Sequence, residues 1–220
     1  MSWDLFPTSA KITDLTNTKQ DETVIDDDEG PMLSKKNPRI GDQKLAGLAK
    51  VHKVYSEKKS IGTNKFNTLL NESIGKDIDL KNKTIFIPED AHMTELMTKY
   101  PDHFDTKTED GKKFAGAFVR SHIIDVPTDE PLFKGEMDGN EHPIETLNNT
   151  RRIKIHPPRI ANNDLPKNGA KDTTLITLHG TKVNDKKIIA QAQAKYFYKD
   201  PNQKTSFVVI NKALIKEEEE

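Results

Sequence analysis

The sequence contains no cysteine, and this absence removes several kinds of chemistry together. Without thiols the chain has no disulfide, no thiolate metal site and no cysteine nucleophile, a composition that fits a reducing compartment without proving one. Long apolar runs are also missing, because no segment approaches the roughly 18 apolar residues that span a bilayer. We therefore expect no membrane insertion.

Charge of one sign is not in excess either. The chain has 34 Lys and Arg against 35 Asp and Glu, for a net charge of -1. A balanced chain has no overall attraction for nucleic acid or for an anionic membrane, so other proteins are the expected partners. Hydrophobic residues make up only 33%, which indicates that part of the 220-residue length stays unburied.

Motifs that define a catalytic or cofactor site are absent. The sequence has no G-x-S-x-G elbow, no P-loop and no G-x-G-x-x-G turn. None of its seven histidines forms the His-x-x-x-His pair of a helical zinc site. We predict no catalytic residue, no metal site and no cofactor, and hence a protein that is not an enzyme.

The residues that are present divide the chain into three parts. Residues 1–43 are polar and acidic without helical or strand periodicity, which predicts an extended, poorly structured arm. Residues 44–216 hold the apolar periodicity of one domain, and residues 217–220 form an acidic tail. The arm begins with an apolar tip, Trp3, Leu5 and Phe6, which can dock into a partner's groove or pack back on its own domain.

Helical spacing dominates the first half of this domain and strand patterns the second. The predicted helices cover residues 45–55, 63–75, 90–100 and 114–119, with a strand at Thr84–Pro88 after the second helix. The later predicted strands cover residues 151–155, 173–178, 187–191, 195–198 and 206–210. Asp200-Pro201-Asn202 is turn chemistry, so the last two strands should form a hairpin. Helices before strands favour an α+β fold.

Four stretches of this pattern resemble the fasciclin-like domain. They are residues 66–70, 83–93, 118–124 and 206–215, and Thr146-Leu147 adds a shorter match. The second is similar to the family's strand-Pro-helix signature through Phe86, Pro88 and Asp90, and the third to its Tyr-His-Val-Ile signature through His122. The resemblance implies N-terminal helices packed on a mixed or antiparallel β-rich half, and a non-catalytic adhesion or interaction module.

These motif residues have a structural interpretation. Pro88 ends a strand, Asp90 is placed to cap the next helix, and a ring nitrogen of His122 can bond to the backbone. Ser121 stands where the family has the tyrosine associated with integrin-type adhesion. That exchange weakens the expectation of animal-type adhesion.

One strand carries candidate interaction residues. Arg152, Lys154 and His156 alternate along residues 151–156 and so share one face. These cations can meet a phosphate or an acidic partner, or they can form an ordinary solvated strand face.

Three functional hypotheses follow. The first is a protein-interaction or structural module in a larger assembly, an intracellular complex or a virion shell, tethered by the arm. The second is a secreted or surface adhesion protein. The N-terminal sequence lacks the basic start and apolar run of a secretory signal, which favours the intracellular or virion setting unless a precursor segment precedes Met1. The third is an enzyme of unrecognised type that uses some of His92, His122 and His179.

Overall fold

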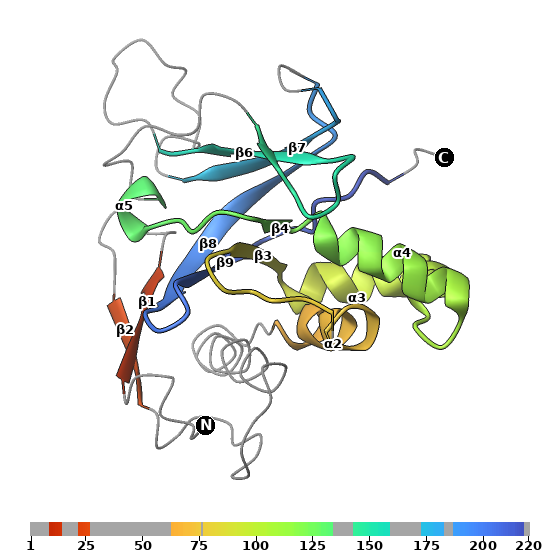
Figure 1. The fold of residues 1–220 in the computed structure, drawn as a ribbon, viewed down its shortest axis with the longest axis horizontal. Helices are drawn as coiled ribbons and strands as arrows, with labels where there is room; N and C mark the ends of the chain where they lie inside the picture. The colour runs from red at the N-terminus through yellow and green to blue at the C-terminus, as the bar shows by residue number, and fades with distance from the viewer. Residues whose placement is uncertain are drawn as a thin grey trace.

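In the part of the chain that the structure describes, a twisted nine-stranded sheet packs against the three longer helices on one side (Figure 1). The computed structural model describes residues 9–14, 22–26, 63–75, 77–133, 143–158, 173–182 and 187–217. Its sheet has the order β4-β3-β9-β8-β7-β6-β5, and β1 pairs with β2 and with β8 off this path.

Three α-helices and a 3-10 helix precede most of the sheet. They are α2 (Asn64–Ser73), α3 (Asp90–Lys99), η3 (Pro101–Phe104) and α4 (Glu109–Arg120), and the short α5 (Glu130–Phe133) follows. Thr108 caps α4, because its hydroxyl accepts a hydrogen bond from the Gly111 amide at 3.0 Å. Within the described residues, no helix combines the length and the apolar character needed to cross a membrane.

The strands fall into a central group and an antiparallel extension. The central group consists of β3 (Thr84–Pro88), β4 (Ile123–Ile124), β8 (Ala190–Asp200) and β9 (Thr205–Ile210). The extension consists of β5 (Ile144–Glu145), β6 (Arg152–His156) and β7 (Leu175–His179). The arm contributes β1 (Ser9–Asp14) and β2 (Glu22–Asp26).

The parallel pair β3 and β9 lies at the centre of the fold. Every residue of both strands is buried, and parallel strands covered on both faces are typically this rich in β-branched residues. Alternate side chains point into two separate cores. Ile85 and Val209 join the core under the helices, whereas Phe86 and Val208 join a second core that contains residues of β6 and β7.

The predicted α+β class is confirmed, with helices on a mixed sheet. Strand β3 has the predicted bounds, and α2, α3 and α4 lie where the helical spacing placed them. The β8–β9 hairpin is also confirmed. The predicted helix over residues 45–55 lies outside the described residues.

Two details of the sequence prediction are wrong. The strands expected at residues 187–191 and 195–198 are not separate, because residues 190–191 and 195–198 belong to the single strand β8, which begins at Ala190 and whose register with β9 shifts between Ala194 and Tyr196. The arm, predicted to be extended and poorly structured, contains β1 and β2, and β1 pairs with β8 through Ile12 opposite Tyr198. The open edge of β8 explains this difference, because unpaired strand groups accept almost any extended segment.

Asp90 caps a helix other than the expected one. It is the first residue of α3, whose N-cap is Glu89, and Asp90 accepts a hydrogen bond from the Lys65 amide in the first turn of α2 at 2.8 Å. The carboxylate thus satisfies the free amide of Lys65, which lies 25 residues earlier in the chain. Spacing along one helix cannot predict such a bond, because it depends on how two helix starts meet in space.

Candidate functional site

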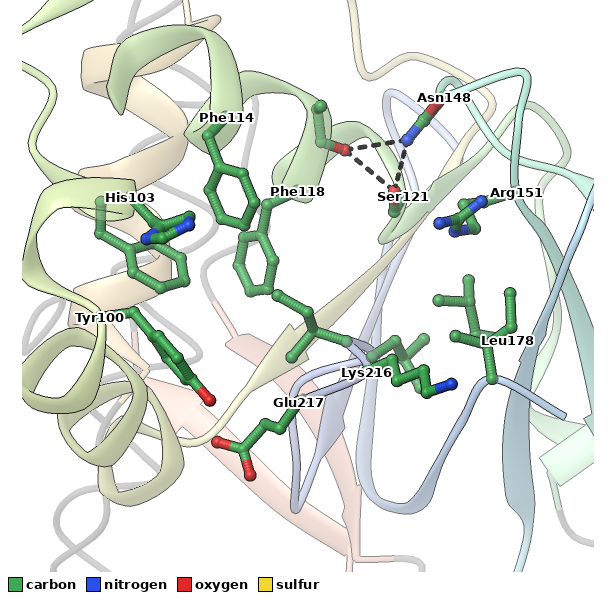
Figure 2. A pocket seen from close by; sticks show the side chains of 15 residues that line it. Tyr100, His103, Phe114, Phe118, Ser121, Asn148, Arg151, Leu178, Lys216 and Glu217 are labelled. Carbon is green, nitrogen blue, oxygen red and sulfur yellow. Dashed lines mark hydrogen bonds between the residues drawn. The ribbon is translucent and has the colours of Figure 1, made fainter. Parts of the chain in front are cut away.

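A pocket of about 390 Å³ lies between α4, η3, the end of β7 and the C-terminal segment 211–217 (Figure 2). This volume is within the range of sites that hold small ligands or a few side chains of a partner. Fifteen residues line it. We call this site the α4 pocket.

Aromatic rings form one side of the α4 pocket. The His103 ring meets the ring of Phe114 edge-on at 4.9 Å and that of Tyr100 at 5.8 Å between centroids. Phe104 contacts both Phe114 and Phe118 in the same edge-on geometry, at 5.5 and 5.3 Å. Rings locked together in this way present an apolar surface of fixed shape, which favours binding of another apolar group.

Polar groups form the opposite end, as Figure 2 shows. The Asn148 side-chain amide donates to the Ser121 hydroxyl at 2.9 Å, and that hydroxyl donates to the Ala117 carbonyl at 2.9 Å. The Arg151 guanidinium donates to the Thr150 carbonyl at 3.0 Å, and no carboxylate of the described residues forms an ion pair with it. Its other N–H groups can therefore bind an acidic group of a ligand.

Ser121 is one of the residues that line the α4 pocket. It lines the pocket at the C-cap of α4, where the fasciclin-like signature has tyrosine. The residue that weakens the expectation of animal-type adhesion is thus one of the residues that line this pocket.

The C-terminal segment forms a wall of the α4 pocket and is held by two histidines. His92 Nδ1 accepts a hydrogen bond from the Ala213 amide at 2.8 Å, and His122 Nε2 accepts one from the Leu214 amide at 2.8 Å. His122 Nδ1 donates to the Phe118 carbonyl at 2.8 Å. Because Nε2 must accept, His122 is neutral and carries its proton on Nδ1.

Burial keeps both histidines neutral. The His122 side chain is fully buried, and desolvation lowers its pKa to about 4 despite its hydrogen bond to the Phe118 carbonyl. Desolvation also lowers the pKa of His92, and the nearby Glu95 opposes that shift. Protonation of either ring would remove the acceptor that holds the segment.

The other predicted motif residues lie in the core. Phe86 and Pro88 belong to β3, and the Glu89 amide after them donates to the Ile210 carbonyl at 3.0 Å. His122 bonds to the backbone as expected, with both ring nitrogens. Trp3, Leu5 and Phe6 lie outside the described residues.

Arg152 and Lys154 share one face of β6, away from the α4 pocket. Arg152 is bound within the chain, because its Nε donates to the Thr181 carbonyl at 3.1 Å and its guanidinium lies 3.9 Å from Glu145. These contacts occupy part of its binding capacity. An interaction at Arg152 and Lys154 stays a prediction.

The face of the sheet that carries Arg152 and Lys154 also carries two histidines, His156 and His179, on either side of the Thr177 hydroxyl. Thr177 Oγ1 lies 2.8 Å from His156 Nε2 and 2.7 Å from His179 Nε2. His179 contacts Thr177, whereas His92 and His122 bond to residues 213 and 214, so none of these hydrogen bonds joins the three histidines of the enzyme hypothesis. No group of three or more metal-ligating side chains occurs in the part of the chain that the structure describes.

Sequence reasoning missed most of the α4 pocket. Its residues come from four separated stretches, 100–121, 148–151, 178–189 and 214–217. A partial signal is the spacing of Phe114 and Phe118, which puts two aromatic rings on one face of a helix. The contribution of Asn148, Arg151 and the C-terminal segment has no local pattern.

Comparison with known proteins finds similarity to solved structures. No family model and no curated protein matches the sequence. The chain is similar to the fasciclin domain pair of the insect cell adhesion molecule fasciclin I, with 17% sequence identity and a TM-score of 0.45. The match covers 69% of this chain and 44% of that chain, so this chain spans less than half of the domain pair.

Proposed function

We propose that the protein is a non-catalytic interaction module that docks on other proteins in a larger assembly through the α4 pocket, with the N-terminal arm as a tether. The observation that carries the proposal is the composition of the pocket. It combines a fixed aromatic side with Arg151 at the polar end, a cation that forms no ion pair with a carboxylate of the described residues. A partner segment with an apolar side chain beside an acidic one fits this arrangement.

The pocket supports binding better than catalysis. The hydroxyl of Ser121 is bonded to Asn148 and to the Ala117 carbonyl, and no imidazole or carboxylate of the described residues contacts it to remove its proton. His122 is next in the sequence, yet both of its nitrogens are bonded to the backbone. These groups shape the site and leave its apolar surface and Arg151 for a ligand.

Site-specific photo-crosslinking tests the proposal. A photoreactive amino acid replaces Ile215, which lines the pocket, in protein expressed where it normally occurs. The matched control is the same replacement of Ile188, which is 50% exposed and lies outside the pocket. We expect protein adducts from position 215 and none of the same mass from position 188.

Two variants change the pocket. Ser121→Tyr is designed to place a ring in the pocket volume. Arg151→Glu reverses the charge at the polar end of the pocket without changing the protein interior. Each should reduce the adducts from position 215. Absence of protein adducts at position 215, or adducts that both variants leave unchanged, would refute docking through the α4 pocket.

A further inference from the structure

The tip of the N-terminal arm has the composition that the α4 pocket selects. Residues 3–6 read Trp-Asp-Leu-Phe, so Asp4 lies between apolar side chains. The pocket offers aromatic rings at one end and the cations Arg151 and Lys216 toward the other (Figure 2). A large aromatic side chain gains most when it enters such a preformed apolar site.

The fold prevents this tip from reaching the pocket of its own chain while β1 keeps its place. Strand β1 runs antiparallel to β8 with Ile12 opposite Tyr198, which puts Ser9 level with residue 201, beyond the far end of β8. Ile189, at the near end, lines the pocket. Ile189 and residue 201 are twelve residues apart, which corresponds to about 40 Å at about 3.3 Å per residue.

The length of the tip decides which copy it can reach. Trp3 is six positions before Ser9, so it extends at most about 21 Å from the strand. Figure 1 places β1 and the C-terminal segment on opposite sides of the molecule. A tip anchored by β1 therefore falls short of its own pocket by a wide margin and is free to enter that of a neighbour.

From these constraints we infer that residues 3–6 of one copy dock in the α4 pocket of a second copy, with Trp3 or Phe6 against the aromatic side and Asp4 beside Arg151. This inference rests on the proposed function, and it names the partner. Tip and pocket are different surfaces, so the contact is heterologous and each copy keeps one free tip or pocket for the next. Repetition of the contact links copies head to tail.

The chain supplies its own probe, because Trp3 is its only tryptophan. Fluorescence emission and acrylamide quenching of the full-length protein therefore report the environment of the tip alone. As protein concentration rises, we expect Trp3 emission to shift to the blue and its quenching to fall. The midpoint of this change gives the affinity of the contact.

Charge variants identify the partner surface. Arg151→Glu should raise the midpoint concentration at least about tenfold, because it sets like charges together. Lys81→Glu is the matched control, since Lys81 is exposed in the turn before β3 and does not line the pocket. It should leave the midpoint unchanged. The double variant Asp4→Arg with Arg151→Glu restores opposite charges and should return the midpoint to within a few-fold of the wild-type value.

Three results would overturn the inference. Trp3 protection that does not depend on protein concentration would place the tip on its own chain. Protection that Arg151→Glu leaves unchanged would place it elsewhere on the neighbour. Trp3 that stays fully quenchable, while pocket crosslinks to another protein form, would refute self-docking and leave the proposed function standing.

Discussion

Neutral His122 should make the stability of the protein depend on pH in a specific window. The folded protein holds its pKa at about 4, whereas an unfolded chain has the ordinary value of 6.5. Between these values the unfolded chain binds a proton that the folded protein excludes. The contribution of His122 to stability is therefore complete above pH 6.5 and is lost as the pH falls toward 4.

The magnitude follows from the size of the shift. A depression of the His122 pKa from 6.5 to about 4 corresponds to about 3 kcal/mol of unfolding free energy, at about 1.4 kcal/mol per unit. That amount is a large fraction of the stability of a typical domain. Loss of the Leu214 bond should also release the wall of the α4 pocket before the remaining core unfolds.

Replacement of the ring isolates this effect. His122→Gln keeps an acceptor for the Leu214 amide, and His122→Asn keeps a donor for the Phe118 carbonyl, but neither can bind a proton. Urea denaturation of wild type and both variants from pH 7.5 to pH 4 measures the unfolding free energy. We expect the wild type to lose about 3 kcal/mol more than either variant over this range. Parallel loss in all three proteins would refute the argument.

Two further variants and a control probe the scaffold. Asp90→Ala removes the acceptor for the Lys65 amide, so we expect a loss of about 1 kcal/mol and a melting temperature about 2–4 °C lower, measured by calorimetry; an unchanged melting temperature would show that the cap is not used. Gly111→Ala puts a Cβ against the Asp105 carbonyl oxygen, so we expect the unfolding free energy measured in urea to fall by about 1–3 kcal/mol. An unfolding free energy equal to that of the wild type would contradict the close approach of Gly111 to the Asp105 carbonyl. Ile188→Ser, at a half-exposed site, should change stability by no more than about 0.5 kcal/mol.

Local patterns predicted the elements that depend on local chemistry. Strand β3 has its predicted bounds because a β-branched run ends at Pro88, which has no amide proton for the ladder. Helix α4 follows the spacing of its buried residues Ala115, Phe118 and Val119. In both cases the residue pattern of a single segment is enough to predict the helix or strand.

Features made by distant segments were not predictable. Strand β8 continues through Ala192 and Ala194, which have little β-propensity, because it pairs with β7 and β9 on its two sides. Asp90 serves α2 because tertiary packing brings two helix starts together. The α4 pocket needs the end of α4 and the C-terminal segment side by side, a placement set by the two histidine bonds to residues 213 and 214.

The most direct test of docking through the α4 pocket is a density map of the protein within its native assembly. We predict polypeptide density from another chain between Phe118 and Arg151, with an acidic side chain beside the guanidinium. A pocket open to solvent in the assembled state, or one filled by a small molecule, would contradict the proposal.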